Sequence, residues 1–518
     1  MLWVIVIGLF FAVVFYSIYR GRANYFKKRG IGGPEPWLFF GNIFQLSKST
    51  APLTLQKWAK IYGHTFGCFQ GSQPVLVTSD VDVLQDVFIK KFSCFHGRQV
   101  APDQPDPDAE SRSSVFRARG LRWKRLRTLS NPTFSSSKLK QMFSHVEESA
   151  AVLLSRLKQV TGTGIDIYPY FQEFTLEVIA KVAFGETTPL QGNTDNPYID
   201  ACKEIFGAHT SGKRVYTMLS ILMPEIRPQL TFLFNRVFRG GTRQFGAHGY
   251  LSDRIERLVE QRKEHGSENR ETPRDFIQLF LEAEAGDSEE SKEMLSLTEQ
   301  SVELDARKMT VEIVEQCKVF LLAGYDTTAA TLAYMAYCLA MNPDCQKTLT
   351  EEIDRVVQAG DELTYSTVQH IDYLELVFKE TLRMYPLASF ANNRLCMADC
   401  DVGGRRVQKG LIVAANVWAL HYDPAIWGDD AHQFRPTRFS PSESRGRHPL
   451  AYMPFGAGPR MCIGQRLANA EAKLLMAKIL AKFEIVRCEK TCPLSFGGRV
   501  TLTPVAVHVK LNERRTIV

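Results

Sequence analysis

The 518-residue sequence lacks several features that would place it in a common class of protein. Its middle has no proline-, serine- or glycine-rich linker, so we expect one large domain rather than separate cores. It also lacks zinc-finger spacing, an RNA-binding signature and a long basic tract, which argues against a nucleic-acid partner. No Gly-x-Gly-x-x-Gly fingerprint follows a predicted strand, so the chain is not expected to bind a dinucleotide itself.

Signs of secretion are missing as well. No Asn-x-Ser/Thr acceptor without an intervening proline occurs, which agrees with a body that stays outside the secretory lumen. The 11 cysteines are scattered and odd in number, which argues against a disulfide framework and favours a reducing compartment. The net charge of +7 suits an anionic membrane surface or an acidic protein partner.

Residues 1–19 carry no charged side chain. As a helix they would span roughly 28 Å, close to the hydrocarbon thickness of a bilayer, so we predict a transmembrane anchor. A cleaved signal peptide is the alternative, but the basic n-region and a small-residue cleavage site are missing. Five basic residues follow between positions 20 and 29, which places the body in the cytosol. Residues 20–42, basic and proline-rich, would form a hinge before a single domain at 43–518.

The remaining sequence predicts a mainly α fold with small β-sheets. Most of residues 130–385 shows helical periodicity, while residues 65–79 have the β-branched, turn-bounded pattern of a hairpin. Residues 310–341 are apolar on most faces and would form a helix roughly 48 Å long, which must run through the middle of the domain. Residues 218–240 mix large apolar side chains with arginine and proline, and fit either a core or a surface that dips into lipid.

A polar break, "AGYDTT", interrupts this central helix at residues 323–328. Burying Asp326 is costly unless the acid is used, which favours a proton-handling site formed with Thr327. The structural alternative is a kink in which the Thr327 hydroxyl bonds the carbonyl of Ala323, four residues earlier. Both interpretations stay open on this motif alone.

Two further pairs are spaced to share one helical face. Glu380 and Arg383 lie three apart in "KETLRMYP", as a solvated surface pair or as a buried one. A buried pair needs a third member, for which Arg438 in "FRPTRF" is the candidate. Trp123 and Arg127 lie four apart in "WKRLR", either on a solvated basic helix or where an indole N–H and a guanidinium bind a planar anion.

The stretch "FGAGPRMCIG", residues 455–464, sets one cysteine among three glycines, a proline and an arginine. Glycines let the backbone turn sharply and aim several amide N–H groups at the Cys462 sulfur, which would stabilise a thiolate and tune a metal bound to it. The structural alternative is a buried free cysteine beside ordinary turns. This pattern is much more specific than the other three.

Taken in chain order, these motifs resemble those of the cytochromes P450. The likeness runs from the proline-rich hinge to the last strand region, and "WKRLRTLSNPTFSSSKLKQM" is most similar to the large drug- and steroid-oxidising group of the membrane-anchored animal type. The resemblance implies the cytochrome P450 fold, a single large haem-enclosing domain behind the N-terminal transmembrane helix. One departure is Thr437, which stands where Pro-x-Arg-Phe often has an acid.

The resemblance also implies roles for individual residues. Cys462 would be the axial thiolate of haem b, and hence the metal ligand, with Phe455 packed near the sulfur and Gly464 letting the next helix approach. Asp326 and Thr327 would relay protons during the activation of dioxygen. Contacts to the haem propionates are implied for Trp123, Arg127, Arg394, Arg460 and, more weakly, Arg98, and a structural triad for Glu380, Arg383 and Arg438.

By the same resemblance the protein would be a monooxygenase of a lipophilic substrate (xenobiotic, steroid or fatty acid) in the endoplasmic reticulum membrane. NADPH would act only indirectly, through NADPH-cytochrome P450 reductase, with cytochrome b5 as a second candidate partner. A basic docking surface is implied at Lys124, Arg125, Lys138 and Lys140, with ordinary solvated charge as the alternative. Two competing functions remain. One is a haem-thiolate isomerase, which the presence of Thr327 argues against, and the other is a haem sensor, for which a proton relay would be superfluous.

Overall fold

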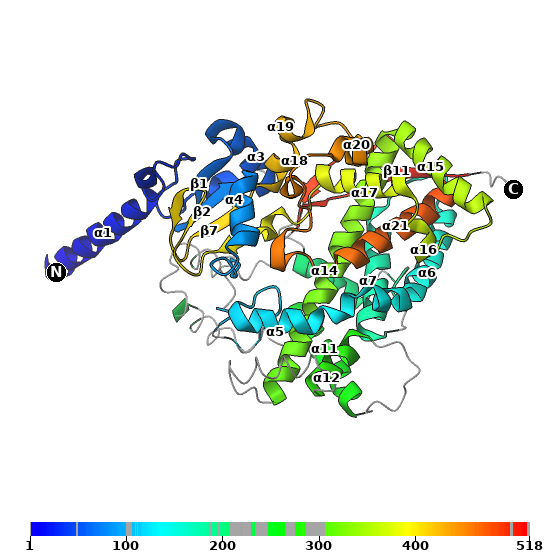
Figure 1. Ribbon diagram of the computed structural model, residues 1–518. Coiled ribbons are helices and arrows are strands. Elements are labelled where there is room, and N and C mark those ends of the chain that lie inside the picture. The colour runs from blue at the N-terminus through cyan, green and yellow to red at the C-terminus, as the bar shows by residue number, and fades with distance from the viewer. Residues whose placement is uncertain are drawn as a thin grey trace.

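The computed structural model describes residues 2–47, 50–99, 106–108, 110, 112–186, 189–193, 196–206, 219, 229–230, 233, 247–264, 275–285, 306–497 and 501–514. Within these ranges the chain is mainly helical with small β-sheets, as the sequence predicts (Figure 1). The segment at 218–240, predicted to lie in the core or to dip into lipid, falls almost wholly outside the described residues.

The α-helices are α1 (Leu2–Ala23), α2 (Ile43–Ser47), α3 (Ala51–Tyr62), α4 (Val81–Gln85), α5 (Gly120–Ser130), α6 (Ser136–Gln159), α7 (Tyr168–Phe184), α8 (Pro197–Phe206), α11 (Ala247–Glu264), α12 (Phe276–Ala285), α14 (Ala306–Met341), α15 (Pro343–Gln358), α16 (Tyr365–Val368), α17 (Asp372–Met384), α18 (Val417–His421), α19 (Pro424–Trp427), α20 (Pro441–Ser444) and α21 (Gln465–Lys482). The strands are β1 (Thr65–Gln70), β2 (Gln73–Thr78), β3 (Gly164–Asp166), β4 (Asn393–Leu395), β5 (Cys400–Val402), β6 (Arg405–Val407), β7 (Ile412–Ala415), β8 (Phe483–Val486), β9 (Phe496–Gly497), β10 (Thr503–Pro504) and β11 (His508–Glu513).

The central helix α14 is 36 residues long and crosses the body of the molecule (Figure 1). It ends at the predicted Met341 but begins four residues earlier than predicted. The sequence at 306–309, Ala-Arg-Lys-Met, consists of strong helix formers, which extend the helix on the N-terminal side of Thr310.

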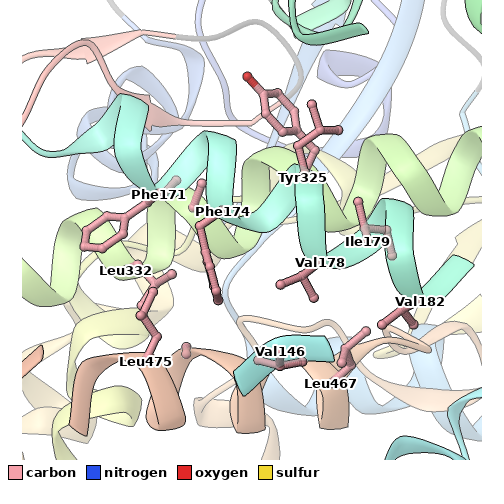
Figure 2. Packing of buried hydrophobic residues seen from close by; sticks show 14 of the residues in the cluster. Val146, Phe171, Phe174, Val178, Ile179, Val182, Tyr325, Leu332, Leu467 and Leu475 are labelled. Atoms are coloured by element: carbon pink, nitrogen blue, oxygen red, sulfur yellow. The ribbon is translucent and has the colours of Figure 1, made fainter. Parts of the chain in front are cut away.

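The core is packed around α14. Figure 2 shows apolar side chains of α7, α14, α6 and α21 meeting in one layer, with Phe174 and Val178 of α7 above Val146 of α6. Leu467 and Leu475, two turns apart on α21, point into the same layer. Full burial of such a side chain is worth about 1.5–3 kcal/mol, so this layer fixes where α14 and α21 lie.

The hairpin predicted at 65–79 is confirmed. Strands β1 and β2 pair antiparallel in a register that sets Thr65 opposite Thr78. This hairpin belongs to a four-stranded sheet of order β1-β2-β7-β4, in which β2 and β7 run parallel. The edge strand β4 carries Arg394. A second sheet has the order β3-β11-β8, and two more contain two strands each, within the described part of the chain.

The N-terminal residues 2–23 form one helix, α1, which extends away from the body (Figure 1). Across the helices described, a search for one with both the length and the apolar character of a membrane span finds none. Phe26, within the predicted hinge, is buried against β1. A Cβ atom at Gly67 would overlap the Phe26 ring, so glycine at this position makes room for the docked aromatic side chain.

Candidate active site

The loop that carries Cys462 is closed by its own backbone and wedged against a neighbouring segment. The Cys462 N–H donates to the Phe455 carbonyl oxygen at 2.9 Å. Gly458 has φ +68°, and a Cβ atom there would overlap the carbonyl oxygen of Phe88. Glycine is therefore required at position 458 for two reasons: the backbone is left-handed there, and the Phe88 carbonyl oxygen lies where a side chain would start. Phe455 itself stacks on Phe378 of α17 with ring centroids 6.4 Å apart.

The Cys462 thiol experiences opposing influences. Burial raises its pKa, whereas the backbone N–H of Gly464 and the positive charges of Arg127 and Arg98 lower it. The residue is nevertheless exposed, even though protein encloses the sulfur closely enough for desolvation to be the largest effect.

Three arginines near this loop have no acidic neighbour among the described residues. The Nε atoms of Arg98, Arg394 and Arg460 have no hydrogen-bond partner among the described residues. Burial lowers the pKa of Arg98 to about 10 and that of Arg460 to about 8, and it lowers the pKa of Arg394 well below its usual value. In proteins a guanidinium stays protonated, so the lowered pKa values mean that three positive charges are buried close together. A bound anion would balance these charges.

The same arginines bind the surrounding backbone. Arg98 Nη2 donates to the Arg460 carbonyl oxygen at 3.0 Å, and Arg394 Nη2 donates to the Ala457 carbonyl oxygen at 3.1 Å. The Arg460 guanidinium lies 4.8 Å over the ring of Trp123, which is buried on α5. The structure thus gathers Arg98, Arg394, Arg460 and Trp123 from four segments around the cysteine loop.

Glu380, Arg383 and Arg438 form one buried cluster. Arg383 donates to both carboxylate oxygens of Glu380, at 2.7 and 2.8 Å, and Arg438 Nε donates at 3.2 Å to the oxygen that the Arg383 Nη2 group also contacts. All three side chains are at most 1% exposed. Thr437, which replaces an acid, leaves Arg438 paired, because Asp430 accepts from its Nη1 at 2.6 Å.

His421 continues this cluster towards the cysteine loop. Its Nδ1 lies 3.0 Å from the Arg383 carbonyl oxygen, so that nitrogen carries the hydrogen, and its Nε2 accepts from the Met453 N–H at 3.1 Å. Burial, reinforced by Arg383, lowers the pKa of His421 to about 3, so the ring is neutral at physiological pH. The sequence offers no local signal for this role, because Met453 lies 32 residues away.

Asp326 and Thr327 are adjacent in α14 but make separate contacts. Asp326 is buried, and its Oδ1 accepts from the Tyr168 hydroxyl at 2.5 Å. Thr327 Oγ1 donates to the Ala323 carbonyl oxygen at 2.6 Å, the bond expected of a structural kink. Ala323 is exposed and Thr327 half-buried in the middle of a buried helix, so no described segment covers this face of α14.

One sequence expectation differs from the structure. Arg125 is buried and pairs with Glu312 of α14, which also accepts from Arg122 Nε at 2.7 Å, so Arg125 is not part of an exposed docking surface. The signal for this pairing was an acid within an otherwise apolar central helix. A Cβ atom at Gly464 would lie 3.7 Å from the Phe134 ring, an ordinary contact, and the expectation that this glycine lets the next helix approach stays a prediction.

The comparison with family models decides the identity. The cytochrome P450 model matches residues 31–511. The chain belongs to the cytochrome P450 family. Among curated proteins it is similar to three from Caenorhabditis elegans: CYP13A3 is 39% identical over 99% of both chains, CYP13A4 38% over 97% of both, and CYP13A5 38% over 95% of both.

As a cytochrome P450, the protein is a monooxygenase that uses haem with a cysteine thiolate ligand and electrons supplied by a redox partner. The described residues fit such a group. Haem brings carboxylates that balance the cations of Arg98, Arg394 and Arg460, whose Nε atoms lack partners among these residues. It would also bring an iron atom able to accept a thiolate, and Cys462 is exposed among the described residues.

Proposed function

We propose that Cys462 is the axial ligand of haem in a monooxygenase that inserts one oxygen atom of O2 into a lipophilic substrate, with electrons from NADPH delivered by a separate reductase. The observation that carries the proposal is the cluster of Arg98, Arg394 and Arg460 around the exposed thiol, without an acid among the described residues to balance them. When bound, the haem supplies dioxygen activation and oxygen transfer to a C–H bond.

The residues around the sulfur prepare it to bind iron. The N–H groups of Gly464 and Gln465 and the cation of Arg127 favour the thiolate over the thiol. Phe455 holds the loop through its carbonyl and its stacked ring. Arg98, Arg394 and Arg460, with Trp123 and Arg127 on α5, hold the haem carboxylates in this proposal.

Two sets of residues act at a distance from the sulfur. The Glu380–Arg383–Arg438 cluster is the proposed structural triad, because it anchors α17 to the segment before the cysteine loop. The second set is on α14, where Thr327 holds a proton at Oγ1 on the uncovered face of the helix and Asp326 resupplies it. The proposed substrate classes are a xenobiotic, a steroid and a fatty acid.

The proposed setting is the cytosolic face of the endoplasmic reticulum membrane, with residues 1–19 as the anchor, 20–42 as the connecting segment and 43–518 as the monooxygenase domain. The uncharged sequence before Arg20 supports this arrangement. Deleting residues 1–19 should weaken membrane attachment and leave haem binding intact. Loss of haem from the deleted protein would contradict the assignment.

The proposed redox partner is NADPH-cytochrome P450 reductase, with cytochrome b5 as a second donor. Lys124, on the α5 helix that carries Trp123, and Lys140 on α6 are exposed, and Lys138 on α6 is half-buried. An acidic partner would find these charges on its approach to the cysteine loop. Charge reversal at Lys124 should slow reduction of the protein by the reductase without changing the spectrum of the carbon monoxide complex. An unchanged reduction rate would exclude this surface as the docking site.

The ligand assignment is tested by the spectrum of the reduced protein with carbon monoxide. The wild-type protein should show the thiolate type, and Cys462→Ser should lose it. Cys488→Ser, at a half-buried free cysteine, is the matched control and should keep it. A thiolate spectrum retained in Cys462→Ser would show that Cys462 is not the iron ligand. With purified reductase, product should form only when NADPH is consumed; turnover without electrons would favour an isomerase.

A further inference from the structure

The carboxylate of Asp326 is held on both oxygens by neutral donors from outside its own helix. Tyr168 donates to Oδ1 at 2.5 Å, and Gln172 Nε2 donates to the same oxygen at 3.1 Å. Thr501 Oγ1 donates to Oδ2 at 3.1 Å. Tyr168 and Gln172 lie four apart on one face of α7. Asp326 is therefore turned towards α7 and the segment at 501–503, and no described contact joins its carboxylate to the Thr327 hydroxyl.

We propose that Tyr168 is a positioning residue for Asp326: its hydroxyl holds the carboxylate against α7 and sets the pH at which that group takes up its proton. The inference rests on the proposed function, in which Asp326 resupplies a proton to Thr327. A donor bonds an ionised carboxylate more strongly than a neutral acid. Protonation of Asp326 therefore weakens the bond to Tyr168 and frees the acid to turn towards Thr327.

The surroundings of Asp326 give this one bond a large effect. Burial raises the pKa of Asp326, and the hydrogen bonds from Tyr168, Gln172 and Thr501 lower it, in that order. Among the described residues, the titratable groups that interact electrostatically with it are Tyr168 on α7, Tyr325 and Tyr334 on α14, and Cys202 on α8. No lysine, arginine or histidine among the described residues pairs with Asp326, so neutral donors alone stabilise its ionised form.

Tyr168 remains a hydrogen-bond donor whether Asp326 is ionised or protonated. Burial and the nearby Asp326 raise its own pKa far above the usual value for tyrosine. It therefore does not give up its proton to become a competing base. Its hydroxyl can release Asp326 and recapture it without changing charge, which is what a positioning role requires.

Tyr168→Phe tests this role while keeping the ring in the core. The carboxylic C=O stretch of Asp326, identified as the infrared band that Asp326→Asn removes, should persist in the haem-loaded variant to a pH about one to two units higher than in the wild type. Tyr170→Phe is the matched control, because Tyr170 lies on the same helix beneath Arg156 instead. The control midpoint should equal the wild-type value.

A second readout is the pH profile of product formed per NADPH consumed. The protonated acid is the form that donates, so this ratio should fall as pH rises through the Asp326 midpoint. In Tyr168→Phe the fall should move to higher pH. Asp326→Asn separates the two proposals, because an unchanged profile in that variant overturns the relay, whereas the position of the infrared band tests Tyr168 alone.

An Asp326 midpoint that is unchanged or lower in Tyr168→Phe would overturn the inference, as would an equal shift in Tyr170→Phe. Site-specific 3-fluorotyrosine at position 168 covers the case in which the phenylalanine variant does not fold. This analogue keeps the hydroxyl and makes it a stronger donor, so the Asp326 midpoint should move to lower pH. A midpoint that stays in place with the analogue would also overturn the inference.

Discussion

The Nε2 atom of His421 accepts a hydrogen bond from the backbone N–H of Met453 at 3.1 Å, two residues before Phe455. On its other side the same ring bonds the carbonyl oxygen of Arg383. The imidazole thus joins the buried ion cluster of α17 to the start of the cysteine loop.

His421 should make stability depend on pH. Its folded-state pKa, about 3, lies below the ordinary value of 6.5, so the unfolded chain binds a proton more readily than the native protein. The free energy of unfolding should fall as pH drops from 6.5 towards 3, by up to about 1.4 kcal/mol per unit from this group. Guanidinium unfolding of wild type and His421→Gln at several pH values measures it. Equal slopes in the two proteins would contradict the assignment.

Glu380→Gln should destabilise the protein by about 3–5 kcal/mol, because it leaves the buried cations of Arg383 and Arg438 without their carboxylate. Chemical unfolding and haem content are the measurements. Glu375→Gln is the control, since Glu375 on the same helix pairs with Lys379 and Lys473 while remaining partly exposed. A small effect at 380, similar to that at 375, would show that the cluster is dispensable.

Gly458→Ala should cost at least about 2 kcal/mol and reduce the fraction of protein with a thiolate spectrum, because the new Cβ overlaps the Phe88 carbonyl. Gly446 also has a positive φ, +84°, but nothing lies within 4 Å of a Cβ there. Gly446→Ala therefore reports backbone strain alone. Equal losses in the two variants would mean that crowding at Phe88 is unimportant.

Arg394→Gln should speed loss of haem to a scavenger protein by roughly tenfold to a hundredfold, the range expected when one charge-assisted hydrogen bond is lost. The apoprotein should lose less stability than the haem-bound form, because the variant removes a buried cation that has no acidic partner among the described residues. Arg406→Gln, at an exposed arginine on β6, should leave the rate unchanged. An unchanged rate in Arg394→Gln would exclude this contact.

Thr327→Val should lower the product formed per NADPH tenfold or more, since positioned proton transfer contributes roughly 10²–10⁴ in rate. Thr331, one turn later, makes the same kind of backbone bond, to the Thr327 carbonyl oxygen at 2.8 Å. Thr331→Val therefore controls for bending of the helix. Equal losses in both variants would favour the structural kink over the relay.

The sequence predicted those features of the site that depend on residues close together in the chain. The i, i+3 spacing of Glu380 and Arg383 and the glycines around Cys462 could be interpreted without knowing which distant segments meet there. Arg438 lies 58 residues from Glu380; the need of a buried pair for a third member made it the candidate, and the family resemblance placed it in the triad. Arg125 was misassigned because its partner, Glu312, is 187 residues away, and charge alone does not show which face of α5 is buried. Tyr168 was missed for the same reason, being 158 residues from Asp326.

The sharing of Glu312 by Arg122 and Arg125 constrains how these three positions can change over evolutionary time. Loss of either arginine leaves the carboxylate with one cation and the interior still neutralised. Loss of Glu312 leaves the buried Arg125 without its acid, whereas the half-buried Arg122 keeps its bonds to the Pro107 and Glu110 carbonyl oxygens. Loss of the acid should therefore follow, rather than precede, the replacement of Arg125.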